Sequence, residues 1–154
     1  MKVATLLYKK NAFLHEVNKE NLIYENAQLV IGFGLGELIT NRETFETLQS
    51  KFPNATICLS STAGEIFDIE VFEDTISIVA IFFSSSYIKT ALVNIQDIES
   101  SFEAGKNLVY QLPKENLKFG FGVEPSGKVC VNGLEKLEVA VATDKSLLFV
   151  NQLH

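Results

Sequence analysis

The stretch Thr56–Phe67, TICLSSTAGEIF, decides how the rest of the chain is interpreted. It opens with four apolar or β-branched residues, Thr56–Leu59, and such a run predicts a buried strand. It then changes to small residues and hydroxyls, which let backbone N–H groups approach a bound molecule closely, and Gly64 can adopt positive φ. Loops of this kind bind anions or polar small molecules through main-chain donors. The candidate ligand-binding residues are Ser60, Ser61, Thr62, Gly64 and Glu65. The alternative is a plain tight turn whose serines bond the next amides.

The residues before this stretch predict a strand and then a helix. Gln28–Gly34 contains the apolar run LVIGFG and is expected to be a buried strand. Thr40–Phe52 is expected to be a helix, with Thr40 or Asn41 as its N-terminal cap. Its inward face is predicted to consist of Phe45, Leu48 and Phe52. A strand, a helix and a second strand in this order predict a parallel strand pair.

Three glycines, Gly32, Gly34 and Gly36, follow one another at alternate positions. Their spacing is GxGxG, whereas a dinucleotide-binding fold requires GxGxxG, and no acidic residue follows a second strand at the expected distance. We therefore interpret these glycines as residues that permit a tight turn out of the sheet.

The N-terminal half contains further candidate elements around this unit. Val3–Tyr8 predicts a first strand, and Ala12–Lys19 is expected to form a short helix. Glu70–Asp74 is acidic and resembles a turn. Thr75–Phe83 and Tyr87–Ile95 are both β-prone and are joined by a short polar loop, which predicts an antiparallel hairpin.

A second helix and several short strands are expected in the C-terminal half. The helix begins after Asp97, with Ser100 or Ser101 as its cap, and ends at Pro113. Its apolar side is predicted to be Phe102, Leu108, Val109 and Leu112. The remaining segments are strands at Lys118–Val123, Lys128–Asn132, Val139–Ala142 and Leu147–Val150, with a possible helix start at Leu134–Leu137. The expected fold is one domain of the α/β (α+β) class, residues 1–154, with a mixed sheet, an antiparallel hairpin and helices packed on the sheet.

Composition and charge exclude several function classes. The chain has 154 residues and is 47% apolar, which suits one domain with a substantial core. Its net charge is −6 and its thirteen basic residues are scattered, so neither a nucleic acid nor an anionic membrane is an expected partner. No apolar run reaches the roughly 20 residues of a membrane span, and the N-terminus does not resemble a signal peptide. We expect a cytoplasmic protein.

Few residues offer conventional catalytic or metal chemistry. Cys58 and Cys130 lie in apolar runs, where buried free thiols are usual, and their spacing does not form a metal site. His15 and His154 lie beside no triad-like cluster, and His15 is expected at the surface. No cofactor and no metal are expected. Glu65 remains open to three roles: it can orient a ligand amine, act as an acid/base group, or solvate the loop.

The run LSSTAGEI at Leu59–Ile66 resembles the CSTAGEI-type signature of the FIST N-terminal domain family. LVIGFG, SFEAGKNLVYQL and the VNGLEKL segment at Val131–Leu137 are similar to other parts of that family, so the resemblance covers about Leu29–Leu137, and the tail Val139–His154 is not matched. The resemblance implies a bacterial sensory domain that binds small molecules such as amino acids and is coupled to a signalling output. It implies no catalytic residues. It also implies that Ser60, Ser61, Thr62, Gly64 and Glu65 border the ligand site.

The leading hypothesis is therefore a small-ligand sensing or binding module without catalysis, acting in signal transduction with a possible signalling protein partner. The alternative is a protein–protein interaction module or partner subunit, which acidic charge and exposed strand edges would suit. A third hypothesis is an enzyme that uses Glu65 with a loop hydroxyl, although a lone carboxylate beside serines lacks an activating base.

Overall fold

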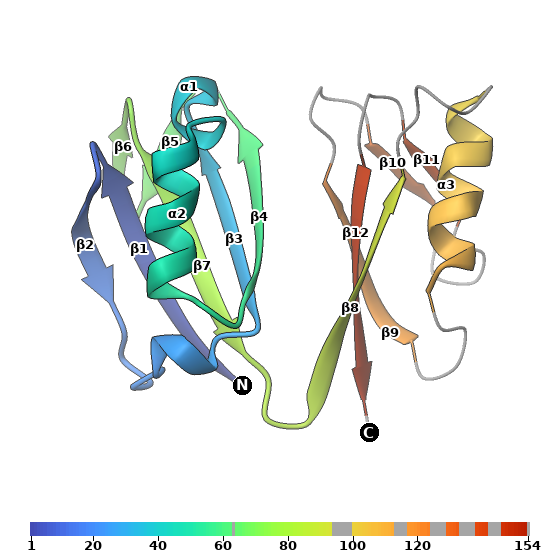
Figure 1. Ribbon diagram of the computed structural model, residues 1–154, viewed down its shortest axis with the longest axis horizontal. Helices are drawn as coiled ribbons and strands as arrows, with labels where there is room; N and C mark the ends of the chain where they lie inside the picture. Colours follow the sequence, from blue (N-terminus) through green and yellow to red (C-terminus); the bar gives the residue numbers. More distant parts are fainter. Residues whose placement is uncertain are drawn as a thin grey trace. The chain divides into compact units, whose positions relative to one another are not determined.

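The computed structural model describes residues 1–62, 64–93, 100–112, 117–123, 129–132, 138–141 and 146–153. Contacts divide the chain into two compact units, residues 1–84 and 85–154, and each has a sheet of its own. Figure 1 shows the elements of both units. Within the described residues the fold is α+β, as predicted.

The first unit is built on a five-stranded mixed sheet in the order β2-β1-β7-β3-β4. Its strands are β1 Lys2–Lys9, β2 Ala12–Val17, β3 Leu29–Gly34, β4 Thr56–Ser61 and β7 Ile76–Phe82. β3 and β4 are parallel, as predicted, and the other neighbouring pairs are antiparallel. A short hairpin of β5 Glu65–Phe67 and β6 Glu70–Phe72 forms a separate two-stranded sheet.

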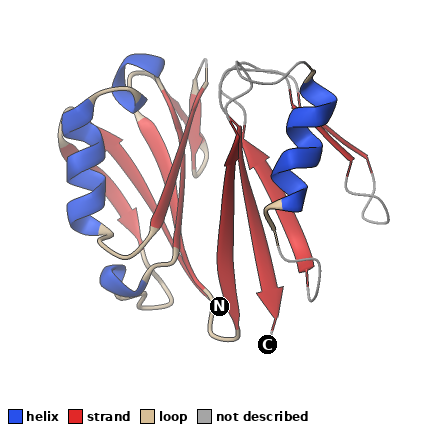
Figure 2. Ribbon diagram, turned by 45° about the vertical axis from the view of Figure 1, so that its right-hand side comes forward, coloured by secondary structure: helices blue, strands red, loops and turns tan. Residues whose placement is uncertain are grey.

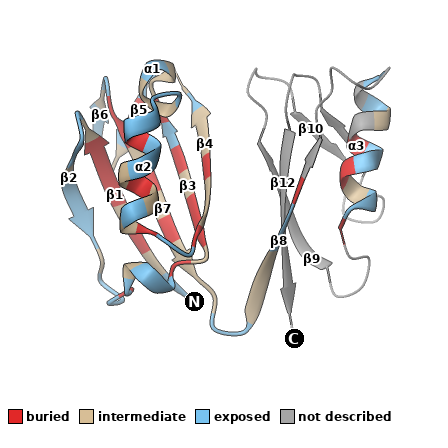
Figure 3. Cartoon of the chain, viewed as in Figure 1, coloured by how far each residue is buried: buried red, intermediate tan, exposed pale blue. Residues whose placement is uncertain are grey.

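One helix, α2 Arg42–Lys51, covers one face of this sheet (Figure 2). Asn41, one of the two caps that the sequence predicts, caps it by accepting a hydrogen bond from the backbone N–H of Glu43. A 3-10 turn, Tyr24–Asn26, precedes β3, and the four-residue helix α1, Gly36–Ile39, follows it. Figure 3 shows buried residues on the strands and on α2. The core cluster contains Ala4, Leu6, Tyr8, Leu22, Ala27, Val30, Leu48, Phe52, Ala55, Ile76, Ile78 and Ala80.

The second unit has a three-stranded antiparallel sheet in the order β8-β12-β9 and a two-stranded antiparallel sheet of β10 and β11. Its strands are β8 Ser86–Val93, β9 Leu117–Val123, β10 Val129–Asn132, β11 Glu138–Val141 and β12 Ser146–Leu153. Helix α3, Ser101–Tyr110, contacts β11 and β8. Ser100, one of the two predicted caps, caps this helix: its hydroxyl accepts a hydrogen bond from the N–H of Glu103.

Three predictions about individual elements are wrong. Ala12–Val17 is a strand and not a helix, because Lys10 and Asn11 both adopt positive φ and turn the chain back along β1. Glu70–Phe72 is strand β6 and not a turn. β7 and β8 do not pair with each other: β7 lies between β1 and β3, whereas β8 pairs with β12.

The predicted helix faces are partly correct. Leu48 and Phe52 are buried, but Phe45 is 45% exposed and Thr44 takes the inward position instead. In α3, Leu108 is buried, as is Leu112 just after the helix, whereas Phe102 is exposed. The expected helix start at Leu134–Leu137, the helix stop at Pro113 and the terminal His154 lie outside the described residues.

Candidate functional site

The carboxyl ends of β3 and β4 meet at one edge of the sheet, where α1 also lies (Figure 1). The register pairs Phe33 with Ser60 and Gly34 with Ser61. The backbone N–H of Thr62 extends this ladder by donating to the Gly34 carbonyl oxygen at 3.0 Å. Ligands in open α/β sheets bind beyond the carboxyl ends of parallel strands, which makes this edge the candidate site.

Glu65 forms the inner base of the turn. It is only 4% exposed, and each of its carboxylate oxygens accepts one hydroxyl hydrogen bond. Thr62 Oγ1 donates to Oε1 at 2.8 Å, and Thr75 Oγ1 donates to Oε2 at 2.9 Å. A buried carboxylate is costly unless it is hydrogen-bonded, so these two contacts fix both ends of the turn against the start of β7.

Thr75 is the member of this network that sequence reasoning missed. The sequence indicated only that it opened an apolar strand, yet its side chain is fully buried and its carbonyl oxygen accepts from the Leu35 N–H at 3.2 Å. The available signal was one hydroxyl at the head of the apolar run TISIVAIFF, a position where a buried polar group needs a partner.

The outer part of the turn is open. Ser61 and Gly64 are exposed, and Ser60 and Thr62 are half-buried. Within the described part of the chain, the hydroxyls of Ser60 and Ser61 have no hydrogen-bond partner, in contrast to the Thr62 hydroxyl.

Ser60 and Ser61 lie on opposite faces of β4, because successive strand residues alternate. Ser61 is on the side of α1, since a Cβ built on Gly36 would lie 3.9 Å from Ser61 Cβ. Ser60 shares the other face with Cys58. The structure therefore brings Thr62 and Glu65 into contact, whereas the side chains of Ser60 and Ser61 lie on opposite faces of β4 and only Ser61 is on the α1 side.

Gly64 does not adopt the positive φ that its position suggested, and a Cβ built on it would meet no atom within 4 Å. Space is restricted at the end of β3 instead. A Cβ on Gly34 would lie 2.5 Å from the Thr75 carbonyl oxygen, and one on Gly32 would lie 2.6 Å from Leu59 Cδ2. Gly34 is therefore needed for close packing against the backbone of the neighbouring strand and not for the turn that we expected, whereas at Gly32 the nearest atom belongs to a flexible leucine side chain.

Besides Glu65, two side chains with catalytic potential, Cys58 and His15, offer no reactive group at the open turn. Burial raises the pKa of the Cys58 thiol to about 12, so this thiol is not an activated nucleophile. His15 is exposed on β2, as predicted, and its ring lies 6.1 Å from that of Phe67 and 6.3 Å from that of Phe72. No cluster of three or more metal-ligating side chains occurs among the residues that the structure describes.

A shallow surface hollow of about 520 Å³ lies between β2 and α2, and none of the predicted site residues lines it. Its basic group, Lys51, is already engaged: Nζ lies 2.7 Å from Glu16 Oε1 and 4.4 Å from the ring centroids of Phe13 and Tyr24. Burial tends to raise the pKa of Glu16, but hydrogen bonds from Lys51 and Tyr24 hold it below its usual value. Burial and the same carboxylate raise the pKa of Tyr24 to about 12. The hollow therefore lies beside an ion pair, between Lys51 of α2 and Glu16 of β2, that has a structural role.

Comparison with known proteins places the chain in a family. No curated protein matches it. None of the helices in the described ranges is long and apolar enough for a membrane span. The family model of the FIST N domain matches residues 28–150, which include the turn after β4 and extend through most of the tail that the sequence resemblance left unmatched. The chain therefore belongs to the FIST N domain family, a family of sensory domains in signal transduction.

Proposed function

We propose that this protein senses a small polar ligand, such as an amino acid, at the turn that follows β4, and that it does so without catalysis. The observation that carries the proposal is the division of this turn into a fixed base and an open rim. Thr62, Glu65 and Thr75 bond one another, whereas the Ser61 hydroxyl has no partner among the described residues and is exposed to solvent.

On this proposal the rim on the α1 side contacts the ligand. The Ser61 hydroxyl donates to or accepts from the ligand's polar groups, and Gly64 leaves room for the ligand because no atom lies within 4 Å of its Cβ position. Thr62 borders the ligand with its half-buried side chain. Ser60 lies on the other face of the sheet and serves as a natural control.

Glu65 acts from behind the rim. Each carboxylate oxygen can accept two hydrogen bonds and accepts one from a threonine, so one acceptor position on each remains for a ligand amine that reaches this depth. A preorganised base of this kind lowers the cost of ordering the turn upon binding. Two observations support a binding role over a catalytic one: both carboxylate oxygens are held by threonine hydroxyls, and the nearby Cys58 thiol has a raised pKa.

The test is a thermal-shift screen of the full chain against the twenty amino acids and common metabolic acids and amines at millimolar concentration. A ligand at a hundredfold excess over Kd stabilises the folded state by about 2.7 kcal/mol. Ser61→Ala is then expected to weaken the Kd about tenfold, as loss of one hydrogen bond does, while Ser60→Ala changes it less than twofold.

The absence of a shift with every compound would contradict the proposal. A loss of binding that follows Ser60→Ala and not Ser61→Ala would place the ligand on the opposite face of β4 and reject the assigned rim. Turnover of any bound compound would reject the non-catalytic role.

A further inference from the structure

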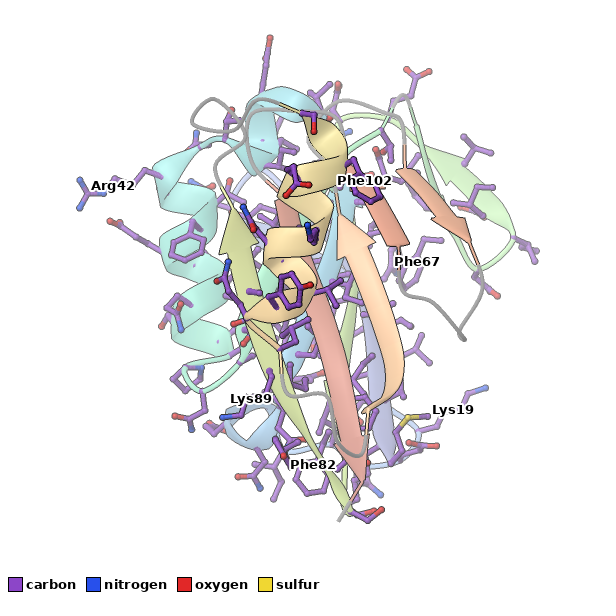
Figure 4. All side chains as sticks on the ribbon, turned by 90° about the vertical axis from the view of Figure 1, so that its right-hand side faces the viewer. Lys19, Arg42, Phe67, Phe82, Lys89 and Phe102 are labelled. Atoms are coloured by element: carbon purple, nitrogen blue, oxygen red, sulfur yellow. The ribbon has the colours of Figure 1, made fainter. Side chains whose placement is uncertain are left out.

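The β5–β6 hairpin exposes an apolar surface that the fold itself does not use. Ile66 pairs with Val71 across the hairpin, so their side chains project from the same face, and Ile69 lies in the connecting turn. Their exposed fractions are 70%, 74% and 89%, the highest among the exposed large hydrophobic residues that the structure describes. Figure 4 shows side chains that stand away from this hairpin, where Phe67 is labelled.

The opposite face of the hairpin is anchored to the first unit. Glu65 binds Thr62 and Thr75, and the rings of Phe67 and Phe72 lie beside His15 of β2. Because strand residues alternate, anchoring this face presents Ile66 and Val71 outward on a fixed support. Exposed aliphatic side chains gathered on one rigid element are typical of a docking surface.

Acidic residues flank this apolar patch along the chain. Asp68, Glu73 and Asp74 are exposed, as is Glu70 on the opposite face of the hairpin, and residues 65–74 contain no Lys or Arg. Lys9 is the cation that the described contacts bring to this segment, and it donates to the Glu73 carbonyl oxygen at 3.0 Å. Three carboxylates next to three aliphatic side chains favour a partner that offers the opposite charge beside its own apolar contacts.

We propose that the exposed side chains of residues 66–74, the outer hairpin surface, dock a segment of a partner protein in which apolar residues are flanked by Lys or Arg. The aliphatic side chains contribute the buried area, and the carboxylates supply the charge complementarity that selects a basic partner. This inference does not depend on ligand sensing. If the proposed ligand site is also correct, Glu65 connects the two, since it holds the turn and begins β5.

The test uses two fluorescent heptapeptides with alternating leucine, one with Lys and one with Glu at the other positions, titrated with the full chain by fluorescence polarisation. The Lys peptide is expected to bind, more weakly as salt increases, while the Glu peptide does not. Ile69→Ser/Val71→Ser and Asp68→Lys/Glu73→Lys are each expected to weaken binding at least tenfold. Matched controls are Ile23→Ser/Phe45→Ser, exposed apolar residues elsewhere on the unit, and the double charge reversal Glu25→Lys/Glu43→Lys.

Equal binding by the hairpin and control variants, equal binding of the two peptides, or no binding at all would overturn the proposal. Light scattering distinguishes a second copy as the occupant: a dimer that Ile69→Ser/Val71→Ser dissociates would also overturn it. So would a fall in Tm of more than about 3 °C for that variant relative to its control, because the side chains would then be covered within the chain itself.

Discussion

The ends of β3 and β4 are neighbours in one parallel pair, yet they differ sharply in how closely they are packed. The β3 exit is filled: a Cβ on Gly34 would lie 2.5 Å from the Thr75 carbonyl oxygen. The β4 exit is open: a Cβ on Gly64 would meet nothing within 4 Å, and Ser61 beside it is exposed. Both strand ends are rich in small residues. At the end of β3 a larger side chain would not fit, whereas at the end of β4 space is left unfilled.

The difference shows that small residues mark two kinds of position, one where the chain must pack closely against itself and one where space is left for another molecule. In this protein the closely packed end of β3 holds in place the residues beneath the open turn after β4. The Gly34–Leu35 segment bonds both Thr62 and Thr75, the two residues that hold Glu65 beneath the open turn.

The largest expected effect compares two thiols on β4, the buried Cys58 and one introduced by Ser61→Cys, each as the sole cysteine in a Cys130→Ser background. Burial raises the pKa of Cys58 from 9.0 to about 12, and these three pKa units correspond to a roughly thousandfold lower thiolate fraction at pH 8. A chromogenic disulfide reagent is expected to modify the thiol at position 61 at least a thousand times faster. Comparable rates would show that the β4 exit is not open.

The raised pKa of Cys58 also predicts a pH dependence of stability. The folded-state value of about 12 exceeds the ordinary 9.0, so the unfolded chain releases its proton first. The thiol's contribution is fully present below pH 9 and is lost as the pH rises toward 12. Tyr24 acts in the same direction between pH 10 and about 12. Urea unfolding across this range should show a smaller decrease for Cys58→Ala than for the natural chain.

Gly34→Ala tests the filled exit. The added methyl group would press on backbone atoms of β7 that cannot move aside, so we expect a loss of about 3 kcal/mol in the free energy of unfolding. Chemical denaturation with urea measures it. A loss below about 0.5 kcal/mol would mean that the two strands are less closely packed than described.

The base of the turn is tested by a pair of buried threonines. Thr75→Val removes a donor to the buried Glu65 carboxylate and is expected to cost about 2 kcal/mol, since Oε2 is left unsatisfied. Thr44 is equally buried, but its hydroxyl has no hydrogen-bond partner among the described residues, so Thr44→Val should be neutral or stabilising. Equal losses from both variants would show that the hydrogen bond to Glu65 contributes nothing beyond packing.

The smallest effect is expected at the open exit itself. Gly64→Ala meets no neighbouring atom and needs no unusual φ, so the free energy of unfolding should rise by no more than about 1 kcal/mol through the loss of unfolded-state entropy. The measurement is the same urea titration as for Gly34→Ala. A destabilisation above about 1 kcal/mol would break the contrast between the two exits.

The sequence alone determined most of the strands, narrowed each of two helix caps to a pair of residues, and singled out the turn after β4 as the candidate site. Apolar runs such as Leu29–Gly34 and Thr56–Leu59 fix strands through local burial preference, and Asn41 and Ser100 cap helices through contacts only two or three residues away. These signals are local, so they survive without knowledge of the fold.

Only the tertiary structure decided which strands pair and which side chains of the turn are hydrogen-bonded or exposed. Two adjacent β-prone segments suggested a hairpin, but the partners of β7 are β1 and β3, and pairing is set by contacts far apart in the sequence. Likewise Glu65 is bonded by Thr62, three residues away, and by Thr75, ten residues away across the β5–β6 hairpin. Residue types show which side chains are able to bond, whereas burial and distance decide which of them are held and which remain open.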